Sequence, residues 1–320
     1  MNCIEICAGA GGQAIGLEQA GFEASILVEI DRHACNTLRL NRPSWNVQEA
    51  DIKNFSAKNY RGIELLAGGV PCPPFSVAGK QLGADDERDL FPEAIRLIDE
   101  ARPVAVMLEN VRGFLATEFD AYRESLSKQL KALGYRSDIK LLQASDYNVS
   151  QLRPRVVIVA IQNAYSEYFS WPRPNFAQPR SVGALLSDLM SVNQWRLAEQ
   201  WKQQASTIAP TIVGGSKKHG GPDLGPTRAK KAWAQLGVDG HGIADAAPDT
   251  NFDGMPRLTT RMVARIQGFP DDWQFSGRKT AAYRQIGNAF PPPVAAAVAQ
   301  QIHYSIQSSR RIFAAIEVTI

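Results

Sequence analysis

A cysteine enclosed by prolines is the first group in this chain that could perform covalent chemistry. Cys72 stands in the stretch Pro71-Cys72-Pro-Pro, shortly after a short apolar run. The prolines make this loop stiff, which does not favour packing in a core. Active sites of α/β sheets lie at the carboxyl ends of the strands, where we expect this loop. A thiol held in one direction becomes a nucleophile when a neighbouring group favours its thiolate. We therefore predict that Cys72 is a nucleophile.

An acidic residue follows a second apolar run. Glu109 comes directly after residues 104–108, which read Val-Ala-Val-Met-Leu, and is expected at the end of a strand. Burial there would raise the pKa of its carboxyl, because desolvation disfavours the charged form. Such an acid could donate a proton to a substrate. The alternative is a glutamate that caps a helix or forms a salt bridge.

Polar side chains alternate just before a third apolar run. Gln151, Arg153 and Arg155 precede residues 156–161. In an extended segment this spacing turns all three side chains to one side. The two guanidinium groups could then bind a phosphate or a carbonyl oxygen. The alternative is an exposed polar edge.

A glycine-rich turn near the N-terminus has the spacing of a nucleotide-binding loop. Residues 9–14 read Gly-Ala-Gly-Gly-Gln-Ala and satisfy the pattern G-x-G-x-x-G/A between an expected strand and an expected helix. Glu29 follows at the end of the next strand, where a carboxylate can accept from ribose hydroxyls, and Asp51 would extend the crevice toward an adenine amino group. These residues predict a nucleoside-containing cofactor and leave NAD and S-adenosylmethionine open.

Short apolar runs alternate with amphipathic stretches through the first half of the chain, which is typical of a parallel sheet with crossover helices. This pattern predicts a doubly wound, mostly parallel α/β domain. The expected strands are residues 3–7, 25–28, 64–67, 104–108, 139–142 and 156–161, and the expected helices are residues 13–20, 92–101 and 121–133.

The alternation stops after Ile161, and a stretch rich in Gly, Lys and Trp runs to about Pro256. Helical spacing of Ala, Val and Ile returns at 291–306 and predicts a helix that packs on the first domain. We expect a catalytic and cofactor-binding domain at 1–171, a smaller inserted domain and hinge at 172–284, and a returning segment at 285–320.

Composition fits an ordinary globular enzyme. The chain has 320 residues, is 44% hydrophobic and carries a net charge of +3, which excludes collagenous, coiled-coil and disordered classes. Its four cysteines form no C-x-x-C pair, so we expect neither a metal site nor disulfides. Without a basic start followed by an apolar stretch, and without a membrane-length apolar run, a cytoplasmic protein is expected.

Basic residues concentrate in one window of the expected second domain. Residues 196–235 contain seven Lys or Arg and two Asp or Glu, a balance of +5 that leaves −2 for the rest. Lys217 and Lys218 lie in a glycine-rich stretch, and Arg228 follows. Trp195 borders the window, and Trp201 and Trp233 interleave it. Such a surface could follow a phosphate backbone, although a charge run is more often a solvated face.

Taken together, these residues resemble the C5-cytosine DNA methyltransferases, bacterial enzymes of the restriction-modification type. The resemblance rests on the ordered set Gly9-x-Gly11-Gly12, Glu29, Asp51, Pro71-Cys72, Glu109-Asn-Val, Gln151-x-Arg153-x-Arg155, Arg257-Leu-Thr259 and Gln285-Ile-Gly-Asn288. It covers nearly the whole chain except residues 172–256, where that family keeps its target-recognition domain.

The resemblance implies roles for individual residues. Cys72, Glu109, Arg153 and Arg155 are implied to be catalytic, and the cofactor is implied to be S-adenosylmethionine on a Rossmann-like fold. The implied DNA contacts are Ser76, Gln151, Lys217, Lys218 and Arg228. The implied cofactor residues are Cys7, Gly9, Gly11, Gly12, Glu29, Ile30, Asp51, Ile52, Pro71, Leu90, Asn288 and Ala289. Cys7 and Ile30 replace residues that are often aromatic in the family, and Cys72 is followed by Pro where Gln is usual.

The resemblance also implies a reaction and its partners. Cys72 would add to C6 of a cytosine flipped out of a specific duplex DNA site, with Glu109 at N3, and C5 would receive the methyl group. The protein is expected to be monomeric, with a cognate restriction endonuclease encoded nearby. The alternatives are a structured RNA substrate, a non-catalytic DNA-binding relative, and a nicotinamide dehydrogenase, which has no use for Pro71-Cys72.

Overall fold

The protein is described by a computed structural model that covers residues 1–71, 89–175, 177–214 and 221–317. The chain divides into two compact units. Unit 1 comprises Met1–Leu142, Pro154–Arg173 and Val294–Ile320, and unit 2 comprises Gln143–Arg153 and Pro174–Pro293. The functional division into catalytic and recognition domains stays a prediction.

A seven-stranded sheet forms the centre of unit 1, in the order β3-β2-β1-β4-β5-β7-β6. The first five strands in this order pair in parallel, and β7 runs antiparallel to β5. The strand order reverses between β1 and β4, which is the point where open α/β sheets bind their ligands. The predicted fold class is therefore confirmed. The strands are β1 (Asn2–Ile6), β2 (Glu23–Glu29), β3 (Val47–Glu49), β4 (Leu65–Gly69), β5 (Ala105–Val111), β6 (Tyr135–Gln143) and β7 (Pro154–Gln162).

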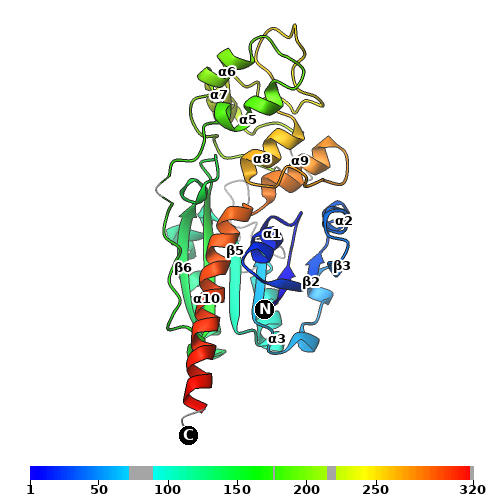
Figure 1. Cartoon of the computed structure of the whole chain (residues 1–320). Coiled ribbons are helices and arrows are strands. Elements are labelled where there is room, and N and C mark those ends of the chain that lie inside the picture. Colours follow the sequence, from blue (N-terminus) through cyan, green and yellow to red (C-terminus); the bar gives the residue numbers. More distant parts are fainter. Residues whose placement is uncertain (72–88, 176, 215–220, 318–320) are drawn as a thin grey trace. The chain divides into compact units, whose positions relative to one another are not determined.

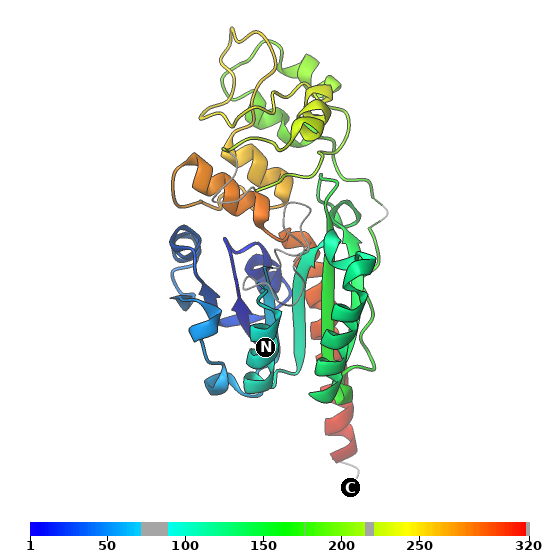
Figure 2. The same ribbon diagram turned by 180° about the vertical axis from the view of Figure 1, so that it is seen from behind.

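Helices cover both faces of this sheet (Figures 1 and 2). On one face, Ile4 and Ile6 of β1 share a core with Phe91 of α3 and Leu126 of α4. The other face carries α1 and α10. Because successive side chains of a strand point to opposite faces, Cys3 and Glu5 turn toward this second face. The helices are α1 (Gly12–Gln19), α2 (Arg32–Asn41), α3 (Phe91–Ala101), α4 (Asp120–Ala132) and α10 (Pro292–Glu317).

The C-terminal helix α10 returns to unit 1, as its helical pattern predicts. The ring of His303 meets Phe22 edge to face at a centroid distance of 5.5 Å. Ser305 donates a hydrogen bond to the carbonyl of Tyr165 over 2.6 Å. Both contacts join segments that lie far apart in the sequence.

Unit 2 is helical, with α5 (Val182–Met190), α6 (Ala198–Gln204), α7 (Thr227–Gln235), α8 (Thr260–Gln267) and α9 (Lys279–Asn288). Its tryptophans correct one expectation from the sequence. Trp195, Trp201 and Trp233 are at most 4% exposed, so they belong to the interior of this unit and do not interleave a basic surface. Large aromatic side chains contribute most when they are buried in a core, which explains their place here.

Candidate functional site

The carboxyl end of β4 leads toward the predicted nucleophile. Gly69 pairs in register with Glu109 of β5, and a Cβ atom at Gly69 would lie 3.4 Å from Glu109 Oε2. Asn110 donates a hydrogen bond to the carbonyl of Val70 over 3.2 Å. Side chains of β5 therefore hold the chain two and three residues before Cys72. Cys72 itself, like Ser76, Lys217 and Lys218, lies outside the described residues.

Glu109 and Arg155 form a direct ion pair within unit 1. Arg155 Nε lies 2.6 Å from Glu109 Oε1, and the residues are 8% and 9% exposed. The antiparallel register of β5 and β7 brings the two side chains together. Burial disfavours the charged carboxylate, but the neighbouring guanidinium favours it. The sequence-based prediction for Glu109 considered burial and did not include Arg155. The alternative, a glutamate in a salt bridge, matches the observed ion pair.

The glycine loop adopts the backbone conformation that its sequence predicts. Cys7, Gly9 and Gly11 have φ values of 51°, 55° and 91°, in the left-handed region that glycine enters without penalty. A Cβ atom at Gly9 would meet nothing within 4 Å. Among the described residues, Gly9 thus presents bare backbone that a ligand could approach closely.

Glu29 lies at the end of β2 and is bound to this loop. Its Oε2 accepts from the Gly9 N–H over 2.7 Å, and its Oε1 accepts from the N–H groups of Ile30 and Asp31. Burial raises the pKa of this carboxyl, while the three backbone donors act in the opposite direction. These bonds fix the carboxyl beside the glycine turn.

Other predicted cofactor residues of unit 1 lie at or near the same edge. Ile30 is 65% exposed, whereas Ile52 is buried. Asp51 caps a short helix, η1 (Ile52–Asn54), by accepting from the Lys53 N–H over 2.9 Å. Pro71 is exposed, and Leu90 is half-buried at the start of α3. Open glycine backbone, carboxylates at strand ends and an exposed apolar side chain suit a nucleoside-containing methyl donor.

The three described thiols are poor nucleophiles. Burial is the main reason why the thiol pKa values of these residues are high. The pKa is well above the ordinary value for Cys3 and Cys7, and it is about 12 for Cys35. The thiol, not the reactive thiolate, is therefore the stable form of all three groups at neutral pH.

Gln151 and Arg153 have other partners than Arg155 has. Gln151 is fully buried; it donates to Gln267 Oε1 and accepts from the Ile212 N–H. Arg153 is also fully buried, and it donates to the carbonyls of Ile212, Gly287 and Ala289. All of these partners belong to unit 2. These bonds give both side chains a structural role, and the DNA contact of Gln151 and the catalytic role of Arg153 stay predictions.

Asn288 and Ala289, the remaining predicted cofactor residues, lie in unit 2 at the end of α9. Ala289 accepts from Arg153 and Gln267 through its carbonyl. A Cβ atom at Gly214 would lie only 2.3 Å from Asn288 Oδ1, so the backbone of Gly214 packs directly against this amide. A contact of these residues with a cofactor stays a prediction.

Exposed charges in unit 2 mark the candidate nucleic-acid surface. Arg228 and Lys231 on α7 are exposed, while Lys230 pairs with Asp223 over 2.8 Å. A second cluster was not predicted from the sequence: Asp239 accepts from Arg257 Nε over 2.7 Å and contacts His241 Nδ1 at 2.7 Å. The sequence does not reveal this cluster, because Arg257 lies 18 residues from Asp239 along the chain.

Two kinds of feature are absent from residues 1–71, 89–175, 177–214 and 221–317. No helix there is both long and apolar enough to cross a membrane. Those ranges also contain no group of three His, Cys, Asp or Glu side chains arranged to hold a metal ion.

Comparisons with known proteins identify relatives of the whole chain. The chain is 59% identical over 302 residues to Type II methyltransferase M.NgoMIV of Neisseria gonorrhoeae, covering 93% of this chain and 96% of the relative. It is 56% identical over 312 residues to M.NaeI of Lentzea aerocolonigenes, covering 96% of this chain and 75% of that protein.

A solved structure shares the fold. A mutant of DNMT2 from Spodoptera frugiperda aligns with a TM-score of 0.67 at 18% identity, covering 94% of this chain and 99% of that one. The model of the C-5 cytosine-specific DNA methylases matches residues 1–304. The chain therefore belongs to the C-5 cytosine-specific DNA methylase family and is a DNA (cytosine-5) methyltransferase.

Proposed function

We propose that this protein transfers the methyl group of S-adenosylmethionine to C5 of a cytosine flipped out of a short, specific duplex DNA site. We further propose that it is the modification enzyme of a Type II restriction-modification system. Support for the biological role comes from its likeness to two Type II methyltransferases, M.NgoMIV and M.NaeI.

The buried pair of Glu109 and Arg155 is the observation that carries this proposal. The two side chains lie within 2.6 Å of each other, and β4, which leads to Cys72, ends against the Glu109 carboxyl. Activation of a cytosine requires an acid, a cation and a thiol. Glu109 and Arg155 supply the first two, and the chain continues from β4 to the thiol of Cys72. The three described cysteines are not ionised, which leaves Cys72 as the candidate nucleophile.

The proposed reaction begins with a bond between Cys72 Sγ and C6 of the base. The electron pair of the C5–C6 double bond then makes C5 a nucleophile while Glu109 holds a proton at N3. C5 forms a bond to the incoming methyl group. Loss of the C5 proton and cleavage of the Sγ–C6 bond restore the double bond and release the thiolate.

We assign Arg155 to hold Glu109 and the base. Its guanidinium fixes the carboxyl through Nε, and the fork of a guanidinium has further donors that suit the cytosine carbonyl. S-adenosylmethionine, when bound, supplies an electrophilic methyl group. Gly9, Glu29, Ile30 and Asp51 are the residues of unit 1 proposed to hold it.

Replacement of the proposed nucleophile tests the mechanism. Cys72→Ala is expected to abolish methyl transfer to duplex DNA, measured with radiolabelled methyl donor, because burial disfavours the thiolate of Cys3, Cys7 and Cys35. Cys35→Ala serves as the matched control and should keep activity. Ordinary turnover by Cys72→Ala would contradict covalent catalysis.

A second experiment reads the product and the intermediate directly. Bisulfite sequencing of DNA from cells that express the chain should reveal methylated cytosines in one short sequence context. Duplex DNA carrying 5-fluorocytosine should form an adduct with Cys72, since fluorine cannot leave C5 as a proton does. Methylation found only in RNA would transfer the proposal to an RNA substrate.

A further inference from the structure

A histidine at the surface of unit 2 is held in one orientation. The side chain of His241 is 71% exposed, and its Nδ1 lies 2.7 Å from Asp239 Oδ1. The same oxygen accepts from the His241 backbone N–H over 3.0 Å, and Oδ2 of Asp239 accepts from Arg257 Nε over 2.7 Å. One carboxyl thus fixes the direction of a histidine and of an arginine, and neither has a place in the proposed reaction.

The turn that carries His241 is anchored to two other segments of unit 2. The Asp239 N–H donates to the carbonyl of Pro256 over 3.0 Å, and the carbonyl of Gly240 accepts from the Leu224 N–H over 3.0 Å. A side chain on an anchored turn that is also held by a hydrogen bond has little conformational freedom left to lose on binding. Such a side chain is suited to contact a ligand.

The bond to Asp239 decides which nitrogen of the ring is left for a ligand. A carboxylate only accepts hydrogen bonds, so Nδ1 of His241 carries the proton that Asp239 accepts. Nε2, on the opposite side of the ring, has a lone pair when the imidazole is neutral. A phosphodiester offers this lone pair no donor, whereas the amino groups of cytosine and adenine are donors at the major-groove edge of DNA. The neutral ring therefore fits a base and not the phosphate backbone.

The neighbouring charges favour a polyanion as the partner. A Cβ atom at Gly240 would lie 3.2 Å from Lys230 Cγ, so the turn packs against α7. On the same helix, Arg228 and Lys231 are exposed. Arg257, with a side chain that is 49% exposed, balances the charge of the carboxylate to which it is bound. A basic surface of this kind attracts DNA without selecting a sequence.

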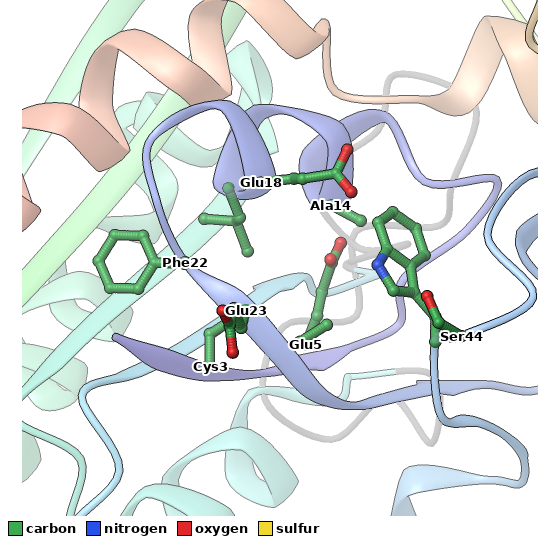
Figure 3. Close-up of a pocket in the computed structure, with 10 residues that line it drawn as sticks. Cys3, Glu5, Ala14, Glu18, Phe22, Glu23 and Ser44 are labelled. Carbon is green, nitrogen blue, oxygen red and sulfur yellow. The ribbon is translucent and has the colours of Figure 1, made fainter.

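Accessibility separates His241 from the carboxyl groups of a cavity beside α1 in unit 1 (Figure 3). That cavity measures about 310 Å³, and its lining includes Glu5 and Glu18. Both carboxyl oxygens of Glu5 are buried, and Glu18 already forms an ion pair with Arg42. A ligand can reach a polar group only where that group is exposed, as the ring of His241 is.

We propose that His241 contacts a base edge in the target DNA and thereby contributes to sequence specificity. The base presents the amino group of a cytosine or an adenine to Nε2. Asp239 is a positioning residue that holds the ring for this contact, and the basic side chains of α7 attract the phosphates beside it. This inference rests on the proposed function, because it requires that the protein binds a specific duplex site.

Affinities for two duplexes test the base contact. Fluorescence anisotropy with the full chain would compare a duplex that contains the site found by bisulfite sequencing with a duplex in which that site is scrambled. His241→Ala should lower the ratio of the two affinities at least about fivefold, the smaller end of what a base contact contributes. Affinity for the scrambled duplex and the slope of log K against log salt should stay as in the parent. His33→Ala, at an exposed histidine of α2, is the matched control and should leave both affinities unchanged.

Asp239→Ala tests the positioning role. This change removes the acceptor that holds the ring, so it should lower the affinity ratio in the parent background. Added to His241→Ala, it should lower the ratio no further, because Asp239 acts through the ring. Thermal unfolding of each variant checks that the fold is retained.

Three results would overturn the inference. These are an unchanged affinity ratio in His241→Ala, an equal loss of affinity for both duplexes, which marks a phosphate contact, and a further fall of the ratio when Asp239→Ala is added to His241→Ala. A parent chain that methylates DNA at one sequence, together with an unchanged ratio in His241→Ala, would contradict this inference alone. A parent chain that methylates no DNA would overturn the proposed function and this inference with it.

Discussion

At the scale of single residues, the ion pair with Arg155 affects both the charge and the position of the Glu109 carboxyl. Burial disfavours the charged form of a glutamate, whereas a guanidinium 2.6 Å away favours it. In the proposed mechanism Glu109 holds a proton at N3 of the cytosine. The carboxyl can do so only if its position beside the ring is fixed. Arg155 therefore positions the acid as well as the base.

Glu109→Gln and Arg155→Lys should both slow methyl transfer. Loss of a positioned acid typically costs about 10² to 10⁴ in rate, and Lys cannot reproduce the fixed fork that reaches Glu109 through Nε. Single-turnover kinetics with saturating methyl donor would measure both effects. Glu124→Gln, which removes a surface acid of α4, is the control; equal rates for all three variants would exclude a role for the pair.

Asp239 makes a prediction about acid stability. Burial raises the pKa of this carboxyl, but bonds from the His241 backbone, the Arg257 side chain and the His241 ring outweigh it and lower the pKa to about 2 from 3.8. A depressed folded-state pKa contributes stability above the unfolded value, and this contribution is lost as pH falls from about 3.8 toward 2. Asp239→Asn should flatten that part of the stability profile, measured by denaturant unfolding; an unchanged profile would contradict the assignment.

At the scale of elements, buried side chains join distant segments of unit 2. Arg153 binds the carbonyls of Ile212, Gly287 and Ala289, so one guanidinium satisfies three backbone acceptors from two segments. Gln151 and Gln267 form a similar bridge. These contacts explain why a residue that alternation assigned to a binding edge lies in the interior.

Arg153→Met should destabilise the protein by about 2 to 4 kcal/mol, because buried carbonyls lose their donor. The neighbouring Leu152, which is 54% exposed, gives the matched control, and Leu152→Ala should stay within about 0.5 kcal/mol of the parent. Urea unfolding followed by tryptophan fluorescence would compare them. A loss of methyl transfer by Arg153→Met without any loss of stability would instead favour the catalytic role.

Much of unit 1 could be predicted from its sequence. Apolar runs such as 104–108 and 156–161 mark strands, and the glycine turn with Glu29 marks the ligand edge. Helix α2 escaped notice because its ten residues average polar, with only Ala34, Cys35, Thr37 and Leu38 buried. The Glu109 to Arg155 pair could not be deduced, since it depends on the antiparallel register of β5 and β7.

At the scale of the whole molecule, a near-neutral chain carries its positive charge unevenly. Residues 196–235 have a balance of +5 within a total of +3. Arg228 and Lys231 of α7 are exposed within this window. DNA is a polyanion whose binding releases counterions, so a concentrated basic surface contributes to affinity in a salt-dependent manner.

Replacement of Lys217 and Lys218 by Ala should reduce the slope of log K against log salt by about 1.8, if each lysine neutralises one phosphate. Fluorescence anisotropy with a labelled duplex at several salt concentrations would measure the slope. The double variant Lys128→Ala and Lys131→Ala removes the same charge from α4 and serves as the control. An unchanged slope for the first variant would remove this stretch from the DNA contacts.

The path of the chain through the two units decides which segments must be exchanged together. The backbone passes from one unit to the other at 142/143, 153/154, 173/174 and 293/294, so unit 2 is assembled from two separate stretches. A genetic exchange that replaces only 174–293 would leave Gln151 and Arg153 facing foreign partners in place of Gln267 and Ile212. Recombination, in nature or in the laboratory, should therefore yield a stable hybrid most readily when the short stretch 143–153 is inherited from the same parent.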